Sequence, residues 1–199
     1  MNKNKLIFIH IPKTAGTAVL EAIGKKGEGG RNHLPWYVYY TSNHLKFRNY
    51  YKFSFVRNPW DRAYSAYEYL LNGGNQHEDI KVSEMIRKFD DFNDFVVNGL
   101  GQGMLRNHLM FAPQSDFIIG PTGEIVVDFV GRFENLNEDF SILADKLGVN
   151  PVLKKQNVNS KKKKNNYIQA YCTNESINIV ANIYKQDITV FGYQFYSDK

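Results

Sequence analysis

The hydrophobic positions of this chain fall into short apolar runs, each followed by a segment with helical spacing. Residues 6–9 and 53–56 are largely apolar and too short for a helix, so each predicts a buried strand. Residues 126–131 predict a third strand. Strands that alternate with helices favour a parallel sheet. We therefore expect a three-layer α/β fold, with a central parallel sheet flanked by helices.

The turn after the first predicted strand reads HIPKTAGT, at residues 10–17. Pro12 interrupts the strand ladder, Gly16 frees the backbone, and Thr14 or Thr17 can cap the helix that follows. Turn amides and the first N–H groups of a helix favour an anion, and Lys13 adds positive charge. We interpret the loop as phosphate-binding; its residues are Lys13, Thr14, Ala15, Gly16 and Thr17. The alternative is an ordinary strand-to-helix turn with a solvated lysine.

This loop differs from the Walker A loop of nucleotide triphosphatases. Its lysine precedes the glycine, and no GK[ST] follows a GxxxxG spacing. The usual magnesium-dependent arrangement is therefore not indicated.

A second strand, turn and helix follow around Arg57. Asn58 suits an N-cap and Pro59 suits the first helical position. Because parallel strands end at one edge of a sheet, Arg57 should face the phosphate loop. Its guanidinium suits a phosphate, and Ser65 can add a hydroxyl; the alternative is that Arg57 only pairs with a carboxylate. For Arg62 we expect a structural role, through an acidic partner.

The rest of the chain predicts more helices and one turn. Residues 83–97 have helical spacing, with a possible break near Asp90 and Asp91. PTGE at 121–124 predicts a hairpin-like turn between residues 117–119 and 125–130.

Two later helices carry recognisable start and stop signals. Asn135 and Glu138 form a possible capping pair for a helix that Gly148 ends. Thr173 or Asn174 starts a last helix, which we expect to pack on the sheet.

Three motifs in this order resemble the carbohydrate sulfotransferase family. They are HIPKTAGT at 10–17, VRNPWDRAYSAY at 56–67 and GRFENL at 131–136, with weaker likeness in FGYQF at 191–195. The resemblance implies one sulfotransferase domain over residues 1–199, with a fold like that of P-loop nucleotide kinases. It also implies transfer of a sulfuryl group from 3′-phosphoadenosine 5′-phosphosulfate (PAPS) to a carbohydrate hydroxyl, with no metal.

The resemblance also implies roles for individual residues. The loop from Lys13 would hold the 5′-phosphate, with Lys13 also catalytic, while Arg57 and Ser65 would hold the 3′-phosphate. The family places a catalytic histidine between these two motifs, and His33 matches it best as the general base, with His44 as the alternative. Glu21 is a third candidate, one residue away from the position of a glutamate base in some relatives. His108 and Gln114 are candidates for acceptor contacts or for packing.

Composition favours one globular domain. The chain has 199 residues, with 43% hydrophobic and 15% aromatic content, enough for a sizeable core. Cys172 is the only cysteine, which excludes an internal disulfide and a cysteine-rich metal site. The N-terminal MNKNK and the short apolar run after it predict neither a signal peptide nor a membrane span. We expect a bacterial cytoplasmic enzyme, unlike the membrane-anchored Golgi members found in animals.

The net charge of +5 has a local origin. Six lysines account for more than all of it: Lys154, Lys155, Lys161, Lys162, Lys163 and Lys164. This distribution argues against a broad nucleic-acid or membrane surface. The lysine-rich stretch is either a solvated loop or a flap that attracts an anionic cofactor or an acidic polysaccharide.

The expected partners are a nucleotide donor and a carbohydrate acceptor, with no nucleic acid. Two other functions stay open from the sequence. One is an ATP-dependent kinase, which would share the sheet and the phosphate loop but need Mg²⁺. The other is a catalytically idle nucleotide-binding or polysaccharide-binding module.

Overall fold

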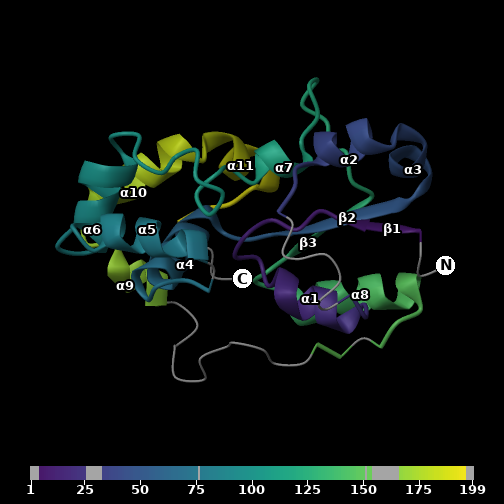
Figure 1. Cartoon of the computed structure of the whole chain (residues 1–199). Helices are drawn as coiled ribbons and strands as arrows, with labels where there is room; N and C mark the ends of the chain where they lie inside the picture. The colour runs from purple at the N-terminus through teal and green to yellow at the C-terminus, as the bar shows by residue number, and fades with distance from the viewer. Residues whose placement is uncertain (1–4, 26–32, 76, 151, 154–165, 196–199) are drawn as a thin grey trace. The chain divides into compact units, whose positions relative to one another are not determined.

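The computed structural model describes residues 5–25, 33–75, 77–150, 152–153 and 166–195. The chain forms two units (Figure 1). The first comprises residues 1–57 and 114–159, and the second comprises residues 58–113 and 160–199. Each unit buries a hydrophobic cluster of its own.

A parallel sheet of three strands is the centre of the first unit. Its strands are β1 (Leu6–Phe8), β2 (Tyr51–Val56) and β3 (Phe129–Arg132), in the order β1-β2-β3. Every residue of the central strand β2 is buried, as a strand covered on both faces requires. The predicted parallel sheet is confirmed. The third strand begins and ends later than the predicted range of 126–131.

Helices cover both faces of this sheet. Helices α1 (Gly16–Ala22) and α8 (Leu136–Leu147) lie on one face, and α2 (Trp36–Ser42) and α3 (His44–Asn49) lie on the other (Figure 1). Val19 of α1 and Phe140 of α8 are fully buried in one cluster with Phe53 and Phe55 of β2. The predicted three-layer α/β arrangement is therefore confirmed.

One predicted helix cap is wrong, and another has the predicted residue without its capping bond. The N-cap of α1 is Ala15, which makes no side-chain cap, because the Thr14 hydroxyl donates instead to the carbonyl of Ile11, at 2.9 Å. Asn135 is the N-cap residue of α8, as predicted, but its side chain makes no capping hydrogen bond. The predicted stop is correct: Gly148 ends α8 with a φ of 66°, in the left-handed region that glycine adopts at low cost.

The predicted turn at 121–124 is present, but residues 117–119 and 125–130 do not form the two strands of a hairpin around it. Phe117 and Ile118 belong to the short helix α7 (Ser115–Ile118) rather than to a strand. Only Ile119 and Ile125 pair, in an isolated antiparallel bridge.

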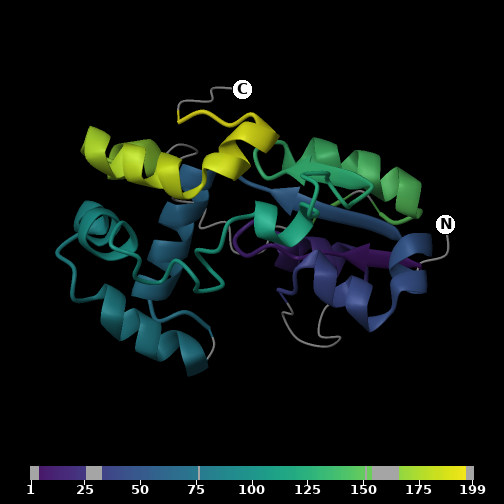
Figure 2. The ribbon, with the colours of Figure 1, turned by 90° about the horizontal axis from the view of Figure 1, so that it is seen from above.

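The second unit is helical in its described residues. It contains α4 (Pro59–Leu71), α5 (His77–Ile86), α6 (Phe92–Asp94), the π-helix η1 (Phe95–Leu100), α9 (Asn166–Ala170), α10 (Asn174–Ile183) and α11 (Lys185–Phe191). Figure 2 shows α4, in blue, between the teal α5 and the yellow α10, and it contacts both. Asn58 caps α4 by accepting the N–H of Trp60, as predicted. The predicted break near residues 90 and 91 is also confirmed, since α5 ends at Ile86 and α6 begins at Phe92.

The last predicted helix is present, but its packing differs from the prediction. Thr173 caps α10 by accepting the N–H of Ser176, at 3.1 Å. The buried face of α10 packs on α4 and on the π-helix, around Val180, so the expectation that it packs on the sheet is wrong.

Arg62 of α4 has the expected structural role with different partners. Its side chain is buried and donates to the carbonyls of Met110, at 3.3 Å, and Ala112, at 2.6 Å. Its guanidinium also lies 5.3 Å from the ring centre of Tyr184. Main-chain carbonyls and an aromatic ring therefore stand in place of the predicted carboxylate.

Candidate active site

The turn between β1 and α1 has an uncommon backbone. Lys13 and Ala15 have φ angles of 68° and 67°, a left-handed conformation that costs a non-glycine residue roughly 1–2 kcal/mol. Gly16 and Thr17 begin α1, so their N–H groups have no acceptor within the helix. Left-handed turns of this kind turn neighbouring amides toward a common point, where they bind anions.

Two contacts hold this turn in place. Thr14 is fully buried, and its hydroxyl bonds to the carbonyl of Ile11. From the end of β2, Nη1 of Arg57 donates to the carbonyl of Lys13, at 3.0 Å. Arg57 therefore faces the loop, as the shared edge of parallel strands predicts.

Besides Lys13, two residues hold Arg57 in place: Phe133 and Gln114. Its guanidinium lies over the ring of Phe133, 4.0 Å from the ring centre, just beyond the end of β3. Its main-chain N–H and C=O both bond to the side-chain amide of Gln114, each at 2.8 Å. Gln114 is fully buried. Of the two predicted roles for Gln114, the structure supports packing, because its amide holds the end of β2.

His33 lies next to this loop through His10. Nδ1 of His33 is 2.8 Å from the carbonyl oxygen of His10, and the two rings are 4.1 Å apart. Because a carbonyl oxygen only accepts hydrogen bonds, Nδ1 carries the proton in this contact. In neutral His33 the lone pair is then on Nε2, which is the nitrogen that could accept a proton.

A family model described as the sulfotransferase family matches residues 1–194. The chain belongs to the sulfotransferase family. Comparisons with curated proteins and with solved structures gave no match. The family assigns the chain to the transferases, and its match extends over both units.

The remaining predicted residues of this sulfotransferase occupy different parts of the fold. In the first unit, Thr17 and Glu21 are half-buried on α1, while His44 is exposed at the start of α3. Ser65 is half-buried on α4, in the second unit. The lysine-rich stretch at 154–164, with all six of its lysines, lies outside the described residues.

His108 also lies in the second unit, where it is half-buried. Burial lowers the pKa of this imidazole below its ordinary value of 6.5, although Asp79 acts in the opposite direction. The N–H of Met110 points to its Nδ1, at 3.4 Å. These contacts suit a neutral histidine with a packing role.

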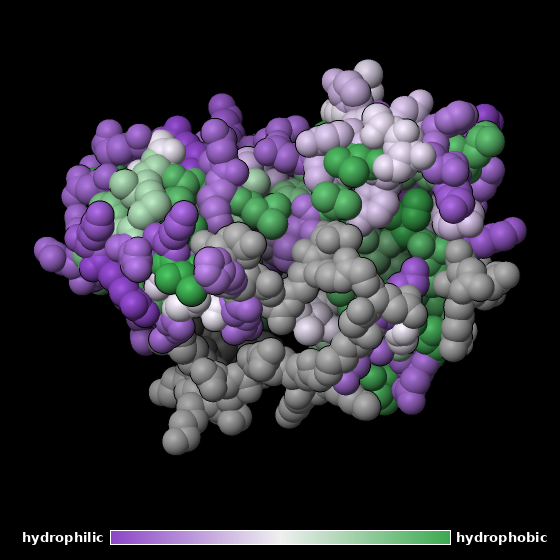
Figure 3. Space-filling view, in the orientation of Figure 1, coloured by the Kyte–Doolittle hydropathy of each residue, from purple (hydrophilic) through white to green (hydrophobic). Residues whose placement is uncertain are grey.

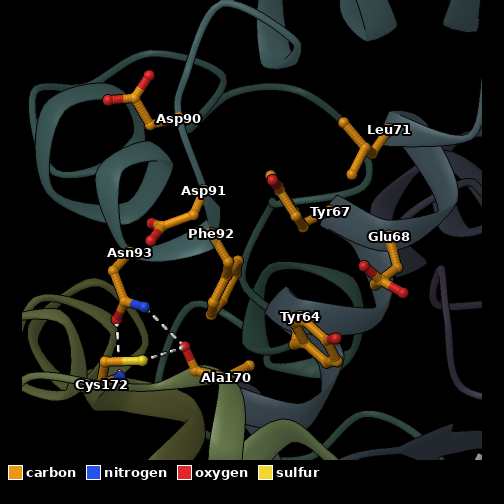
Figure 4. Close-up of a pocket in the computed structure, with 10 residues that line it drawn as sticks. All are labelled: Tyr64, Tyr67, Glu68, Leu71, Asp90, Asp91, Phe92, Asn93, Ala170 and Cys172. Atoms are coloured by element: carbon orange, nitrogen blue, oxygen red, sulfur yellow. Dashed lines mark hydrogen bonds between the residues drawn. The ribbon is translucent and has the colours of Figure 1, made fainter.

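A cavity of about 360 Å³ lies in the second unit (Figure 4). It is lined by Tyr64, Tyr67, Glu68, Leu71, Asp90, Asp91, Phe92, Asn93, Ala170 and Cys172. This lining contains three carboxylates and no basic side chain, so its charge does not suit a doubly phosphorylated nucleotide. None of the predicted donor-binding residues lines it.

Sequence reasoning missed two residues that shape the site. Phe133, under the Arg57 guanidinium, belongs to the GRFENL motif, where an aromatic residue after a strand was the available signal. His10 opens the HIPKTAGT motif and was not singled out, because a lone histidine after an apolar run carries no spacing signal.

The described residues contain no group of three histidine, cysteine, aspartate or glutamate side chains placed to hold a metal ion. No helix in the described part of the chain is long and apolar enough to cross a membrane.

Proposed function

We propose that this sulfotransferase moves a sulfuryl group from PAPS to a hydroxyl of a carbohydrate. The contact of the Arg57 guanidinium with the main chain of the Lys13 loop carries this proposal. It brings two phosphate-binding elements together: a turn whose amides suit one phosphate, and an arginine whose planar donors suit another. A nucleotide phosphorylated at both its 3′ and 5′ positions would use both elements.

The residues of the loop fit the 5′ end of such a donor. The amides from Thr14 to Thr17 would bind the 5′-phosphate, together with the hydroxyl of Thr17. The buried hydroxyl of Thr14 already bonds to Ile11, so this residue would contribute its N–H group. Lys13 would stabilise the negative charge that grows on the leaving phosphate oxygen.

Arg57 and Ser65 would hold the 3′-phosphate and so set the position of the donor. Arg57 is restrained by Phe133 and by the Gln114 amide, which lowers the entropy lost when it binds a phosphate. The role of Ser65, on α4, rests on the family resemblance.

His33 would act as the general base. With Nδ1 bonded to the His10 carbonyl, Nε2 would take the proton of the acceptor hydroxyl. The acceptor oxygen would form a bond to sulfur as the bond from sulfur to the phosphate oxygen breaks, releasing adenosine 3′,5′-bisphosphate. His33 contacts His10 at the start of the loop, whereas His44 is exposed on α3, which favours His33 for this role.

An exposed aromatic surface on α2 supports a carbohydrate acceptor. Tyr37 and Tyr40 are 52% and 49% exposed, a few residues after His33. Figure 3 shows pale and green side chains over α2. Tyrosine offers an apolar ring with a polar hydroxyl, a combination that suits the mixed polar and apolar faces of a sugar.

Calorimetric titration with adenosine 3′,5′-bisphosphate, against ATP with Mg²⁺, tests the donor assignment. We expect the bisphosphate to bind more tightly. Arg57→Ala should weaken this binding about ten- to hundredfold, the equivalent of roughly 1.5–3 kcal/mol for a charged hydrogen bond. Arg48→Ala is the matched control, because Arg48 is an exposed arginine on α3 of the same unit.

Other outcomes separate the rival functions. Preference for ATP with Mg²⁺ would support a kinase and contradict the proposal. Binding of the bisphosphate without sulfuryl transfer to any of a panel of sugars would support an idle module.

A further inference from the structure

His10 is the residue through which the phosphate loop and His33 meet. It lies two residues beyond the end of β1, and it is only 5% exposed. Its ring stacks on Phe8, at 5.4 Å between centres and 16° between planes. A side chain so enclosed has little freedom to move.

The imidazole of His10 also occupies the space beside Gly16. A Cβ atom built on Gly16 would lie 1.9 Å from Nε2 and 2.0 Å from Cδ2 of His10. Non-bonded atoms do not come this close. Position 16 therefore requires glycine because a side chain would collide with the His10 ring, and not because of its backbone angles. Gly16, the first residue of α1, can approach the His10 ring this closely only because it has no side chain.

His10 also makes two contacts with His33. Its ring centre lies 4.1 Å from that of His33, with the two planes tilted by 51°, and its carbonyl accepts a hydrogen bond from Nδ1–H of His33. The ring contact limits where the His33 imidazole can lie, and the carbonyl selects which nitrogen keeps its lone pair.

We infer that His10 is a positioning residue: its ring sets the spacing between the start of α1 and His33, while its carbonyl selects the tautomer of His33. The inference rests on the proposed role of His33 as the base. In this arrangement, His10 fixes the distance between two groups. One is the loop that would hold the donor phosphate, and the other is the imidazole that would activate the acceptor. A group displaced by about 1 Å can lose two orders of magnitude in rate, so this spacing matters for transfer.

A double-mutant cycle between positions 10 and 16 tests the ring as a spacer. Gly16→Ala alone should lower the urea midpoint of unfolding strongly, because its methyl group collides with the ring. In the background of His10→Ala that collision is gone, so the same change should lower the midpoint by less than half as much. If the single variant does not fold, recovery of folding in the double variant gives the same answer. Equal losses in the two backgrounds would overturn the role of the ring.

Nitrogen NMR of the His33 imidazole tests the tautomer. We expect the neutral ring of the wild-type protein to carry its proton on Nδ1. His10→Ala keeps the main-chain carbonyl but removes the ring that holds the His33 imidazole against it. The Nδ1 contact should therefore be made only part of the time, and the variant should show a mixture of both tautomers. Val19→Ala is the matched control for lost stability, because Val19 is fully buried on α1. It should lower the urea midpoint without changing the His33 signals. A wild-type ring protonated on Nε2, or a His33 signal that His10→Ala leaves unchanged, would contradict the inference.

Neither measurement needs substrate. Failure of the proposed function would appear as absent binding of the bisphosphate or absent transfer, with the cycle and the NMR result intact. Failure of the positioning role would appear in the cycle or the NMR spectrum alone.

Discussion

At the scale of single residues, the loop after β1 has a strained backbone that two hydrogen bonds hold in place. Lys13 and Ala15 adopt left-handed angles without being glycine. The Thr14 hydroxyl and the Arg57 guanidinium bond to neighbouring carbonyls and so stabilise this conformation. A backbone held in an unfavourable conformation is typical of a functional site, and under the proposed function it orients the main-chain N–H groups of the loop. A loop held by its own contacts loses less entropy when it binds a ligand.

Removing the ammonium group of Lys13 should affect transfer far more than binding. In Lys13→Ala we expect kcat for transfer from PAPS to fall about 10²- to 10³-fold, because the charge on the leaving oxygen loses its main partner. Affinity for adenosine 3′,5′-bisphosphate should fall much less, since the loop amides and Arg57 remain. Release of the bisphosphate in the presence of a sugar acceptor measures the first quantity, and calorimetry measures the second.

Lys46→Ala is the control for this change, because Lys46 is an exposed lysine on α3 in the same unit. An unaltered rate in Lys13→Ala would remove Lys13 from the mechanism.

At the scale of elements, strand ends position the site. β1, β2 and β3 are parallel, so the Lys13 loop, Arg57 and Phe133 follow three neighbouring carboxyl ends. Contacts between these ends, and not the strands alone, fix the guanidinium. The amide of Gln114 contributes by bonding to both main-chain groups of Arg57.

Replacing Gln114 should therefore destabilise the end of β2. Gln114→Leu has a similar shape but leaves a buried N–H and a buried C=O without their partner. We expect each to cost about 1–3 kcal/mol in the free energy of unfolding, measured by urea denaturation. Gln102→Leu, at an exposed position, should change it little. A Gln114→Leu variant as stable as the wild-type protein would show that water or another group satisfies Arg57.

The sequence predicted those elements whose signals are local. Apolar runs located the strands, and Asn58, Gly148 and Thr173 marked helix ends correctly. Thr14 carried an equally good capping signal and does not cap α1, while Asn135 marks the start of α8 without a side-chain capping bond. The Thr14 hydroxyl instead found a carbonyl within its own turn, which the sequence pattern cannot distinguish from a cap.

The site was predicted in part for the same reason. Arg57 near Lys13 follows from the sharing of one sheet edge, a rule of parallel sheets. The Gln114 amide bonds 57 residues back along the chain, and His33 contacts His10, 23 residues before it. Long-range contacts of this kind leave no periodic or spacing signal.

At the scale of the whole molecule, each unit has a core of a different character. The first core joins the sheet to α1 and α8 through residues such as Val19, Phe53 and Phe140. The second is built among helices and is rich in aromatic rings, with Phe95 and Tyr184 fully buried. Burial raises the pKa of Tyr184 to about 12, so this phenol stays neutral at any physiological pH.

The second unit also contains a group that should make stability depend on pH near neutrality. Burial lowers the pKa of His108 below 6.5, so the folded protein disfavours its charged form. When the pH falls through 6.5, the unfolded chain takes up a proton at this position before the folded chain does. The stabilising contribution of neutral His108 is therefore complete above pH 6.5 and is lost as the pH falls toward its folded-state pKa.

Unfolding by urea at a series of pH values between 7.5 and 5.5 measures this effect. In His108→Gln the side chain cannot take up a proton, so the midpoint should fall less with decreasing pH than in the wild-type protein. The variant can start from a lower midpoint, because it loses ring packing against Phe111. His77→Gln, at an exposed position on α5, should keep the wild-type slope. Parallel curves for His108→Gln and the wild-type protein would mean that His108 meets the same environment in both states, against the burial seen in the fold.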